Sequence, residues 1–236
     1  MTLESILNTI KIILPDLKHT AESILNTIKI ILPGLQYTIG LFAVTIILSI
    51  PLGLLMAFVM HGKSKILKFI LRFYVLIMRG TPLMLQLFFI YFGLPKLPGI
   101  GKFLVMDRFP AACVAFVLNY AAYFCEIFRG GLLSVEKGQY EAAKVLGFTK
   151  TQTMLRVVIP QMFRVVLPPV SNETITLVKD TSLVTAISLS DLMNLTKALV
   201  TSTSNVFPFF IAALFYLVMT YALTKLFNYL EHKFAY

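Results

Sequence analysis

Residues Leu35–Met60 read LQYTIGLFAVTIILSIPLGLLMAFVM, and this stretch decides the fold class. It holds no charged side chain, and about 20 apolar residues are enough for a helix to cross the hydrocarbon of a bilayer. Pro51 and Gly53 lie inside the stretch, but membrane helices tolerate both residue types because neighbouring groups satisfy the freed backbone. The stretch therefore predicts a transmembrane helix.

The composition of the whole chain extends this prediction. Hydrophobic residues make up 58% of the 236, charged residues 14%, and the mean hydropathy is +0.82. Soluble domains contain about 45–50% apolar and about 25% charged residues. The net charge is +10. The charged residues lie between apolar runs, where Lys and Arg set topology and contact anionic lipid. We therefore expect a membrane domain and no nucleic-acid partner.

Four further apolar segments follow the first one. Spans are expected at residues 66–94, 109–128, 161–178 and 205–229, with polar stretches at 129–160 and 179–204. The segment 66–94 contains Pro82 after Arg79, Gly80 and Thr81, and a proline disfavours helix at the residue before it. We expect that span to be kinked or broken, within an all-α integral membrane fold of about five transmembrane helices.

Five spans put the two termini on opposite sides of the membrane. The loop at 60–72, the stretch 129–164 and the C-terminus together hold twelve Lys and Arg, against eight on the other side. Because Lys and Arg concentrate on the cytoplasmic side, we expect a multi-pass cell-membrane protein with its N-terminus outside and its C-terminus in the cytoplasm. The short first apolar stretch lacks a small-residue cleavage site, so no cleaved signal peptide is expected.

The N-terminal segment contains an exact repeat. Glu4–Pro15 and Glu22–Pro33 both read ESILNTIKIILP, with a period of 18 residues, which is five helical turns. Each copy is too short to span a bilayer, and its apolar and polar sides suit an interfacial helix. We separate residues 1–33, a duplicated amphipathic segment with no assigned function, from a membrane domain at 34–236.

The segment 141–160 reads EAAKVLGFTKTQTMLRVVIP and predicts a helical knob between two spans. The EAA residues at its start favour a short helix, and the two alanines allow another surface to approach closely. Gly147 can adopt the left-handed conformation that ends a helix, and Thr149 or Thr151 can cap a second one. An ordinary amphipathic loop is the alternative interpretation.

The same segment resembles the cytoplasmic EAA loop of the permease subunits of bacterial ABC importers. Glu141, Ala142 and Ala143 are followed by Gly147 and then by Val157-x-Ile159-Pro160, where the strict family pattern ends I-x-L-P. Further motifs resemble the polar amino-acid permeases, which handle histidine, arginine, lysine, glutamine, glutamate and opines. These motifs are Arg79-Gly80-Thr81-Pro82-Leu83 with Gln86-Leu87-Phe88, Tyr123 with Glu126-Ile127 and Arg129-Gly130-Gly131, and Asn172-Glu173 with Lys179-Asp180-Thr181-Ser182-Leu183.

This resemblance covers residues 34–236 and implies a set of partners. The chain would pair with a second permease subunit, identical or similar, and two cytoplasmic ATPase subunits would dock on Glu141, Ala142, Ala143 and Gly147 of each knob. An extracytoplasmic solute-binding protein would deliver the amino acid, and the membrane domain would work by alternating access. ATP and Mg would be bound by the ATPase, so this chain is expected to carry no catalytic residue, cofactor or metal.

One apparent nucleotide motif is rejected. His61-Gly62-Lys63-Ser64 ends like a phosphate-binding loop, but position 57, where that pattern requires glycine, is Ala57. The motif also needs a strand before it and a helix after it, whereas here it follows an apolar span. Lys63 is therefore interpreted as a topology charge.

Polar residues inside the predicted spans indicate a solute site, because an ionisable group in hydrocarbon is costly and is functional by default. Asn119 and Glu126 are seven residues apart, as are Glu173 and Asp180, so each pair can share a helix face. We expect these residues to line a water-filled cavity for a cationic or zwitterionic solute. Glu173 and Asp180 would contact its nitrogen atoms.

Neutral hydrogen bonds to the solute are expected from Asn119, Thr181 and Ser182. The alternative for the acidic residues is structural pairing. Glu126 would then neutralise Arg79 or Arg129, and Asp180 would pair with Lys179 or cap the helix that starts near Thr181.

Two classes of protein remain as alternatives to the importer subunit. An ion-driven secondary transporter or channel would use Glu173 and Asp180 to bind a proton or Na⁺, but the five spans show no internal inverted repeat. A non-transporting scaffold would leave the intramembrane polar residues without a role. Cys113 and Cys125 lie in one apolar run, where packing explains them better than a disulfide framework or a metal site.

Overall fold

The structure is a computed structural model, and it describes residues 21–234. Every regular element in that range is helical. The longer helices are α2 (Gly34–His61), α3 (Lys65–Gly80), α5 (Arg108–Ser134), α8 (Ile159–Asp180), α9 (Leu192–Thr203) and α10 (Phe207–Phe234), and the shorter ones include α4 (Leu83–Phe88), α6 (Lys137–Val145) and α7 (Lys150–Thr153).

The predicted membrane spans are confirmed. Within the described part of the chain, four helical segments are long and apolar enough to cross a membrane. The bent pair formed by α3 and Leu83–Lys96 raises this number to five if the pair is one span. The two halves of that pair meet at an angle of 104°, so the interruption at Arg79–Pro82 breaks the helix rather than kinking it gently.

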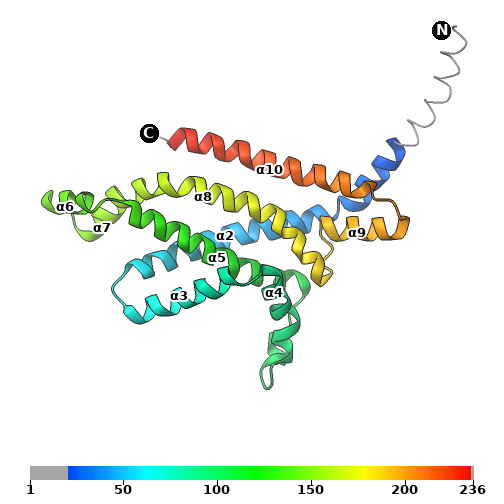
Figure 1. The fold of residues 1–236 in the computed structure, drawn as a ribbon, viewed down its shortest axis with the longest axis horizontal. Helices are drawn as coiled ribbons and strands as arrows, with labels where there is room; N and C mark the ends of the chain where they lie inside the picture. The colour runs from blue at the N-terminus through cyan, green and yellow to red at the C-terminus, as the bar shows by residue number, and fades with distance from the viewer. Residues whose placement is uncertain (1–20, 235–236) are drawn as a thin grey trace, which may run out of the picture.

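The long helices α2, α5, α8 and α10 run along the long axis of the molecule (Figure 1). The helices α6 and α7, the loop between α2 and α3, and the end of α10 all lie toward one end of that axis. Helix α9 lies toward the other end, and the segment after α3 projects sideways from the bundle. The three segments expected on the cytoplasmic side are therefore at the same end of the fold.

The centre of the fold is the contact between α2 and α5. Leu41 and Ala57 of α2 and Phe124 of α5 are fully buried. The backbones approach closely at Gly53, where an added Cβ would lie 2.7 Å from the Cβ of Phe124. Small residues permit this close packing between membrane helices, and they make α2 and α5 a firm support for the polar side chains that α5 carries.

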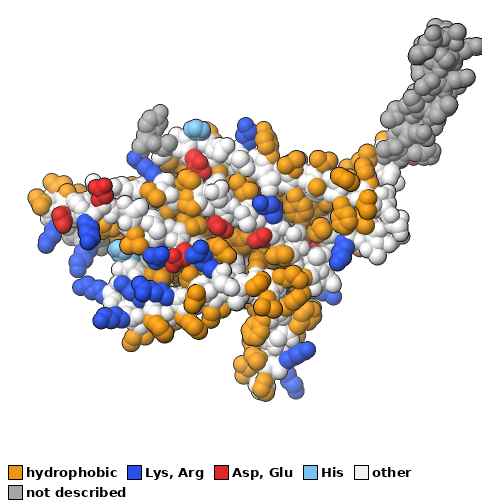
Figure 2. All heavy atoms as spheres, viewed as in Figure 1, with side chains coloured by type: hydrophobic (Ala, Val, Ile, Leu, Met, Phe, Trp, Pro, Cys, Tyr) orange, Lys and Arg blue, Asp and Glu red, His pale blue; other side chains and the backbone are white. Residues whose placement is uncertain are grey.

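Much of the outer surface is apolar, as a lipid-facing surface requires (Figure 2). On α3, Ile66 and Phe69 are each 73% exposed and Val75 is the buried residue of that helix. Lys and Arg gather along the edge that α3 forms in this view, while acidic and basic side chains meet near the middle of the molecule.

Helix α5 extends beyond the predicted third span. Helix α5 continues to Ser134, six residues beyond the expected boundary at 128, because this part still packs on the rest of the fold. Leu132 is buried, and Arg129 is paired with a carboxylate one turn earlier. A π-helix at Met154–Val158 then joins α7 directly to α8.

The second copy of the N-terminal repeat is helical over residues 21–31. Ile31 of this copy is fully buried in an apolar cluster with Leu192 of α9 and Ile211 of α10. Pro33 follows, at the N-cap position of α2. The first copy lies outside the described residues.

Candidate functional site: a charged cavity and a helical knob

A cavity of about 510 Å³ opens where the α3–α4 break meets α5 and α8. Its volume lies in the range typical of small-molecule sites, about 300–1,000 Å³. Three of the six predicted solute contacts line it, namely Asn119 of α5 and Glu173 and Asp180 of α8. The remaining wall comes from Arg79, Gly80, Thr81, Pro82, Leu83, Tyr120, Tyr123, Thr176 and Leu183.

The break between α3 and α4 is held by side-chain amides. The Asn119 Nδ2 donates to the Met78 carbonyl at 2.8 Å and to Gln86 Oε1 at 3.0 Å. The Gln86 Nε2 donates to the Met78 carbonyl at 2.9 Å and to Thr81 Oγ1 at 2.8 Å. Pro82 lacks a backbone N–H, so these bonds replace the interrupted helical ladder. Asn119 therefore positions the broken segment, and both of its amide hydrogens are already used.

The two carboxylates of α8 are held differently. Asp180 Oδ2 accepts a hydrogen bond of 2.7 Å from the hydroxyl of Tyr120. It does not cap the helix that follows, since no side-chain cap bond forms at that position. Glu173 lies two turns earlier on the same helix and lines the same cavity. The seven-residue spacing thus brings both carboxylates to one wall, as the sequence predicts.

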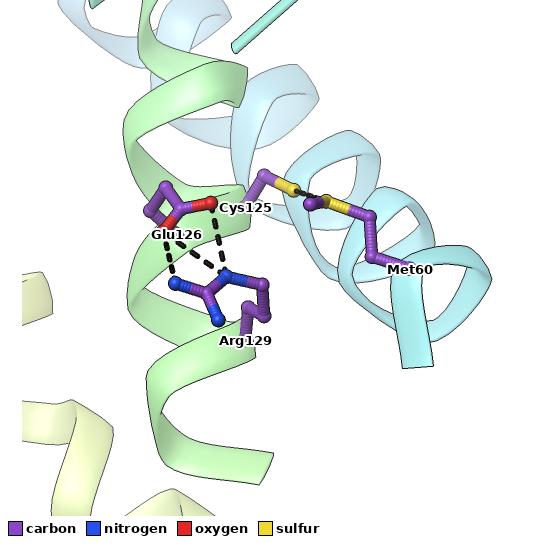
Figure 3. Close-up of polar contacts among 4 residues, drawn as sticks. All are labelled: Met60, Cys125, Glu126 and Arg129. Atoms are coloured by element: carbon purple, nitrogen blue, oxygen red, sulfur yellow. Dashed lines mark hydrogen bonds and ion pairs between the residues drawn. The ribbon is translucent and has the colours of Figure 1, made fainter. Parts of the chain in front are cut away.

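Glu126 does not line this cavity and is paired with Arg129 (Figure 3). Arg129 donates from Nη2 at 2.6 Å and from Nε at 3.0 and 3.1 Å to the two carboxylate oxygens. Glu126 instead lines a neighbouring hollow of about 440 Å³ that also contains Arg72 and Arg79. The structural alternative for Glu126, pairing with Arg129, is the arrangement observed. On the other side of α5, the buried Cys125 thiol contacts the Met60 sulfur at 3.4 Å.

Thr181 and Ser182 do not line the cavity. The buried Thr181 donates its hydroxyl hydrogen to the Val178 carbonyl at 2.7 Å. Ser182 donates to the Lys179 carbonyl at 2.7 Å and borders a separate hollow near α10. Both hydroxyl hydrogens are thus given to carbonyls in the last turn of α8.

The knob consists of α6, α7 and the turn between them. Gly147 ends α6 with φ at +76°, the left-handed conformation that the sequence predicts. Thr149 caps α7 in a reciprocal box with Gln152, in which the Thr149 Oγ1 accepts from the Gln152 backbone and Gln152 Oε1 accepts from the Thr149 backbone. The predicted two-helix knob is therefore confirmed.

The predicted docking residues occupy different sides of the knob. Glu141, Ala142 and Gly147 are exposed, whereas Ala143 is buried and its carbonyl accepts from the backbone N–H of Phe148 at 3.0 Å. Ala143 thus packs the knob against its own chain. Burial also raises the pKa of Tyr140, whose hydroxyl has no hydrogen-bond partner within the described residues.

Sequence reasoning missed several residues that the structure adds. Val145 is 87% and Leu146 73% exposed at the tip of the knob; two apolar residues inside a polar stretch are the signal that marks them. Arg79 and Tyr120 line the cavity. Arg79, a charge within an apolar segment, was available as a signal, whereas no spacing in the sequence distinguishes Tyr120 from other span tyrosines.

A broken membrane helix, a charged cavity beside it and a knob joined to the cavity wall define a polytopic membrane subunit of a transport system. The model of one protein family, the binding-protein-dependent transport system inner membrane component, matches residues 49–236. The chain belongs to this family, and its predicted identity as a permease subunit of the polar amino-acid ABC importers is confirmed.

Curated relatives cover most of the chain. The arginine transport system permease protein ArtQ of Bacillus subtilis is 39% identical over 191 residues, which are 80% of this chain and 85% of the relative. The L-cystine transport system permease protein TcyB of the same organism is 42% identical over 149 residues, or 63% of this chain and 62% of the relative. A putative glutamine transport system permease protein, GlnP of Rickettsia felis, is 35% identical over 191 residues, or 80% of this chain and 86% of the relative.

Solved structures share the fold. A crystal structure of an amino acid ABC transporter with histidines has a TM-score of 0.79 at 32% identity, covering 89% of this chain and 97% of that one. The MetNI methionine ABC transporter in an inward-facing conformation has a TM-score of 0.68 at 17% identity, covering 88% and 95%. The second likeness concerns the fold alone.

Proposed function

We propose that this permease subunit imports basic amino acids, with arginine, lysine and histidine as the candidate solutes. The observation that carries the proposal is the pair of carboxylates, Glu173 and Asp180, on one wall of the cavity between α8 and the α3–α4 break. A carboxylate binds a cationic nitrogen by charge-assisted hydrogen bonds, which are about twice as strong as neutral ones. Relatives named for arginine and octopine transport support the same solute class, while those named for glutamine and cystine define the competing neutral solutes.

The importer would contain two permease subunits, two cytoplasmic ATPase subunits and an extracytoplasmic solute-binding protein. Hydrolysis of ATP belongs to the ATPase subunits, which bind ATP and Mg, and this chain supplies transport rather than catalysis. The knob would dock on an ATPase through Glu141, Ala142 and Gly147, with Val145 and Leu146 adding exposed apolar surface beside them.

Movement of the knob would reach the cavity through α8. The π-helix at Met154–Val158 leads from α7 into α8 without a loop, and α8 carries Glu173 and Asp180. ATP binding would close the ATPase pair and shift both knobs, so that the cavity faces outward. Hydrolysis would return it to the inward-facing state, which is alternating access.

The orientation proposed for the chain places the knob and the C-terminus in the cytoplasm and the N-terminus outside. The α2–α3 loop lies at the same end as the knob (Figure 1). It carries Lys63, and Lys65 begins α3, in keeping with the positive-inside rule. Labelling of single cysteines with a membrane-impermeant reagent tests this orientation: labelling of the knob in intact cells would reverse it.

The experiment that tests the function is ATP hydrolysis by the reconstituted complex of this permease, its ATPase and its binding protein. Basic and neutral amino acids are titrated into it. Selective stimulation by arginine, lysine or histidine is expected. Stimulation by glutamine or cystine alone would overturn the proposed solute class, and failure of correctly folded permease to bind any ATPase would overturn the importer assembly.

A further inference from the structure

The cavity contains charges of both signs, and the proposed amine contacts use only one of them. Glu173 and Asp180 face it from α8, whereas Arg79 enters it from the last turn of α3. A site for a simple amine needs the carboxylates alone. A guanidinium in the same cavity is costly beside a cationic solute unless an anionic group accompanies that solute.

Within residues 21–234, no carboxylate forms an ion pair with Arg79. Glu126, the obvious candidate partner, is occupied by Arg129 through three contacts. Asp180 accepts from the hydroxyl of Tyr120. Among residues 21–234, the ion pair that forms within 4 Å joins Arg129 to Glu126 and does not include Arg79. The donors of Arg79 therefore remain available to a ligand.

The position of Arg79 suits a carboxylate ligand. Its Cζ lies 5.1 Å from the centre of the Tyr123 ring, a cation–π contact. A cation–π contact uses no N–H donor, and the planar fork of N–H groups of an arginine matches the two oxygens of a carboxylate. The bonds from Asn119 and Gln86 to the Met78 carbonyl fix the backbone next to Arg79. The Arg79 side chain therefore starts from a backbone position that tertiary contacts hold in place.

We propose that Arg79 binds the α-carboxylate of the imported amino acid, opposite Glu173 and Asp180, which take its nitrogen atoms. The cavity then recognises the zwitterion and discriminates against amines that lack the carboxylate. This inference rests on the proposed function, because it assumes that an amino acid occupies this cavity during transport.

The test measures ligand binding to the purified permease–ATPase complex without the binding protein. Any discrimination between ligands then comes from the membrane site alone. Three matched pairs of probes are used, each an amino acid and its decarboxylated analogue: arginine with agmatine, lysine with cadaverine, and glutamine with 4-aminobutanamide. The variants are Arg79→Gln and Arg79→Lys. The control is Arg72→Gln, which removes a guanidinium two turns earlier on α3 that lines the neighbouring hollow and not the cavity.

Wild type is expected to bind the amino acid of at least one pair about tenfold more tightly than its analogue, since a bidentate charged contact is lost with the carboxylate. Arg79→Gln should weaken binding of the amino acid about tenfold, should not weaken binding of the analogue, and should bring the ratio of the two affinities close to one. Arg79→Lys keeps the charge but not the fork, so it should give an intermediate ratio. Arg72→Gln should keep the wild-type ratio. Co-purification with the ATPase establishes that each variant is assembled.

Three outcomes would overturn the inference. In the first, Arg79→Gln loses affinity equally for the amino acid and for its analogue. In the second, Arg79→Gln keeps the wild-type ratio of the two affinities. In the third, the wild-type complex binds none of the six probes. If loaded binding protein still stimulates ATP hydrolysis in that last case, the importer function stands and the carboxylate site alone is wrong. If no amino acid stimulates hydrolysis either, the proposed function has failed.

Discussion

The knob and the cavity are both polar regions of a largely apolar protein, but they are built from contacts of very different range. In the knob, the box between Thr149 and Gln152 joins residues three positions apart. In the cavity, the bond from Asn119 to the Met78 carbonyl spans 41 positions and the one from Tyr120 to Asp180 spans 60. The knob is thus a local structure presented to a partner, whereas the cavity exists only when α3, α5 and α8 are packed together.

Because of this difference, substitutions in the two regions should have different effects. A change in the knob should alter partner docking and leave the rest of the fold intact. A change at the cavity should alter solute binding and, where it touches the α3–α4 break, stability as well. Helix α8 belongs to both regions, since it begins at the knob and carries Glu173 and Asp180, so it is the element through which one region can influence the other.

The largest effect is expected where the cavity depends on long-range bonds. Asn119→Leu removes both amide donors: Gln86 Oε1 loses its donor, and the Met78 carbonyl keeps only the bond from Gln86 Nε2. The expected cost is about 2–3 kcal/mol. Thermal unfolding of the purified complex measures the loss, with the exposed Asn172→Leu on α8 as the matched control. Equal melting temperatures for Asn119→Leu and wild type would mean that the break does not depend on these bonds.

A smaller effect is expected at the proposed amine site. Glu173→Gln should weaken a cationic amino acid about thirtyfold, since hydrogen bonds to charged groups contribute about 1.5–3 kcal/mol, and should weaken glutamine much less. Titration of arginine and glutamine against the variant measures the contrast. Glu231→Gln near the end of α10, away from the cavity, is the control. Identical arginine affinity in wild type and Glu173→Gln removes Glu173 from the site.

Charge reversal on the knob tests the other region. Glu141→Lys should reduce the affinity for the ATPase about tenfold, in line with a partly buried interface charge, and should leave membrane insertion and melting unchanged. Glu136→Lys makes the same charge change on an exposed residue just before α6 and should have little effect. Binding of the ATPase to each variant in detergent distinguishes them, and unaltered binding by Glu141→Lys contradicts its role in docking.

The smallest effect is expected from the local cap. Thr149→Ala removes the N-cap of α7, at a cost of about 1 kcal/mol, while Thr151→Ala removes a hydroxyl inside the same helix without touching the cap. Amide hydrogen exchange should quicken in α7 for Thr149→Ala alone, with solute binding unchanged. A loss of solute affinity would show that the knob and the cavity are coupled more tightly than their separate contacts indicate.

Much of the fold follows from short-range patterns. The apolar runs indicate the spans because a helix in lipid must be long and uncharged enough to cross it. The knob follows from Gly147 and Thr149 because stop and cap signals act within about one turn. The continuation of α5 to Ser134 does not follow from hydropathy, because the burial of Leu132 and the pairing of Arg129 are tertiary and side-chain contacts.

The candidate site follows from the sequence only in part. Asn119 and Glu126 share a helix face, but seven residues also separate them by about 10 Å along the axis, so one lines the cavity and the other a neighbouring hollow beside Arg129. Thr181 follows Asp180 in the sequence, but the next position on a helix points elsewhere, and it donates to the Val178 carbonyl instead. Arg79 enters the cavity because the helix breaks at Pro82 and turns by 104°.

The sequence by itself determined the membrane spans, the helical knob and the family, because each depends on residue types within a few turns of one another. Only the tertiary structure decided which charges share a cavity and which neutralise each other. That choice depends on how α3, α5 and α8 pack, and the spacing of polar residues along one helix does not specify the face that its neighbours present.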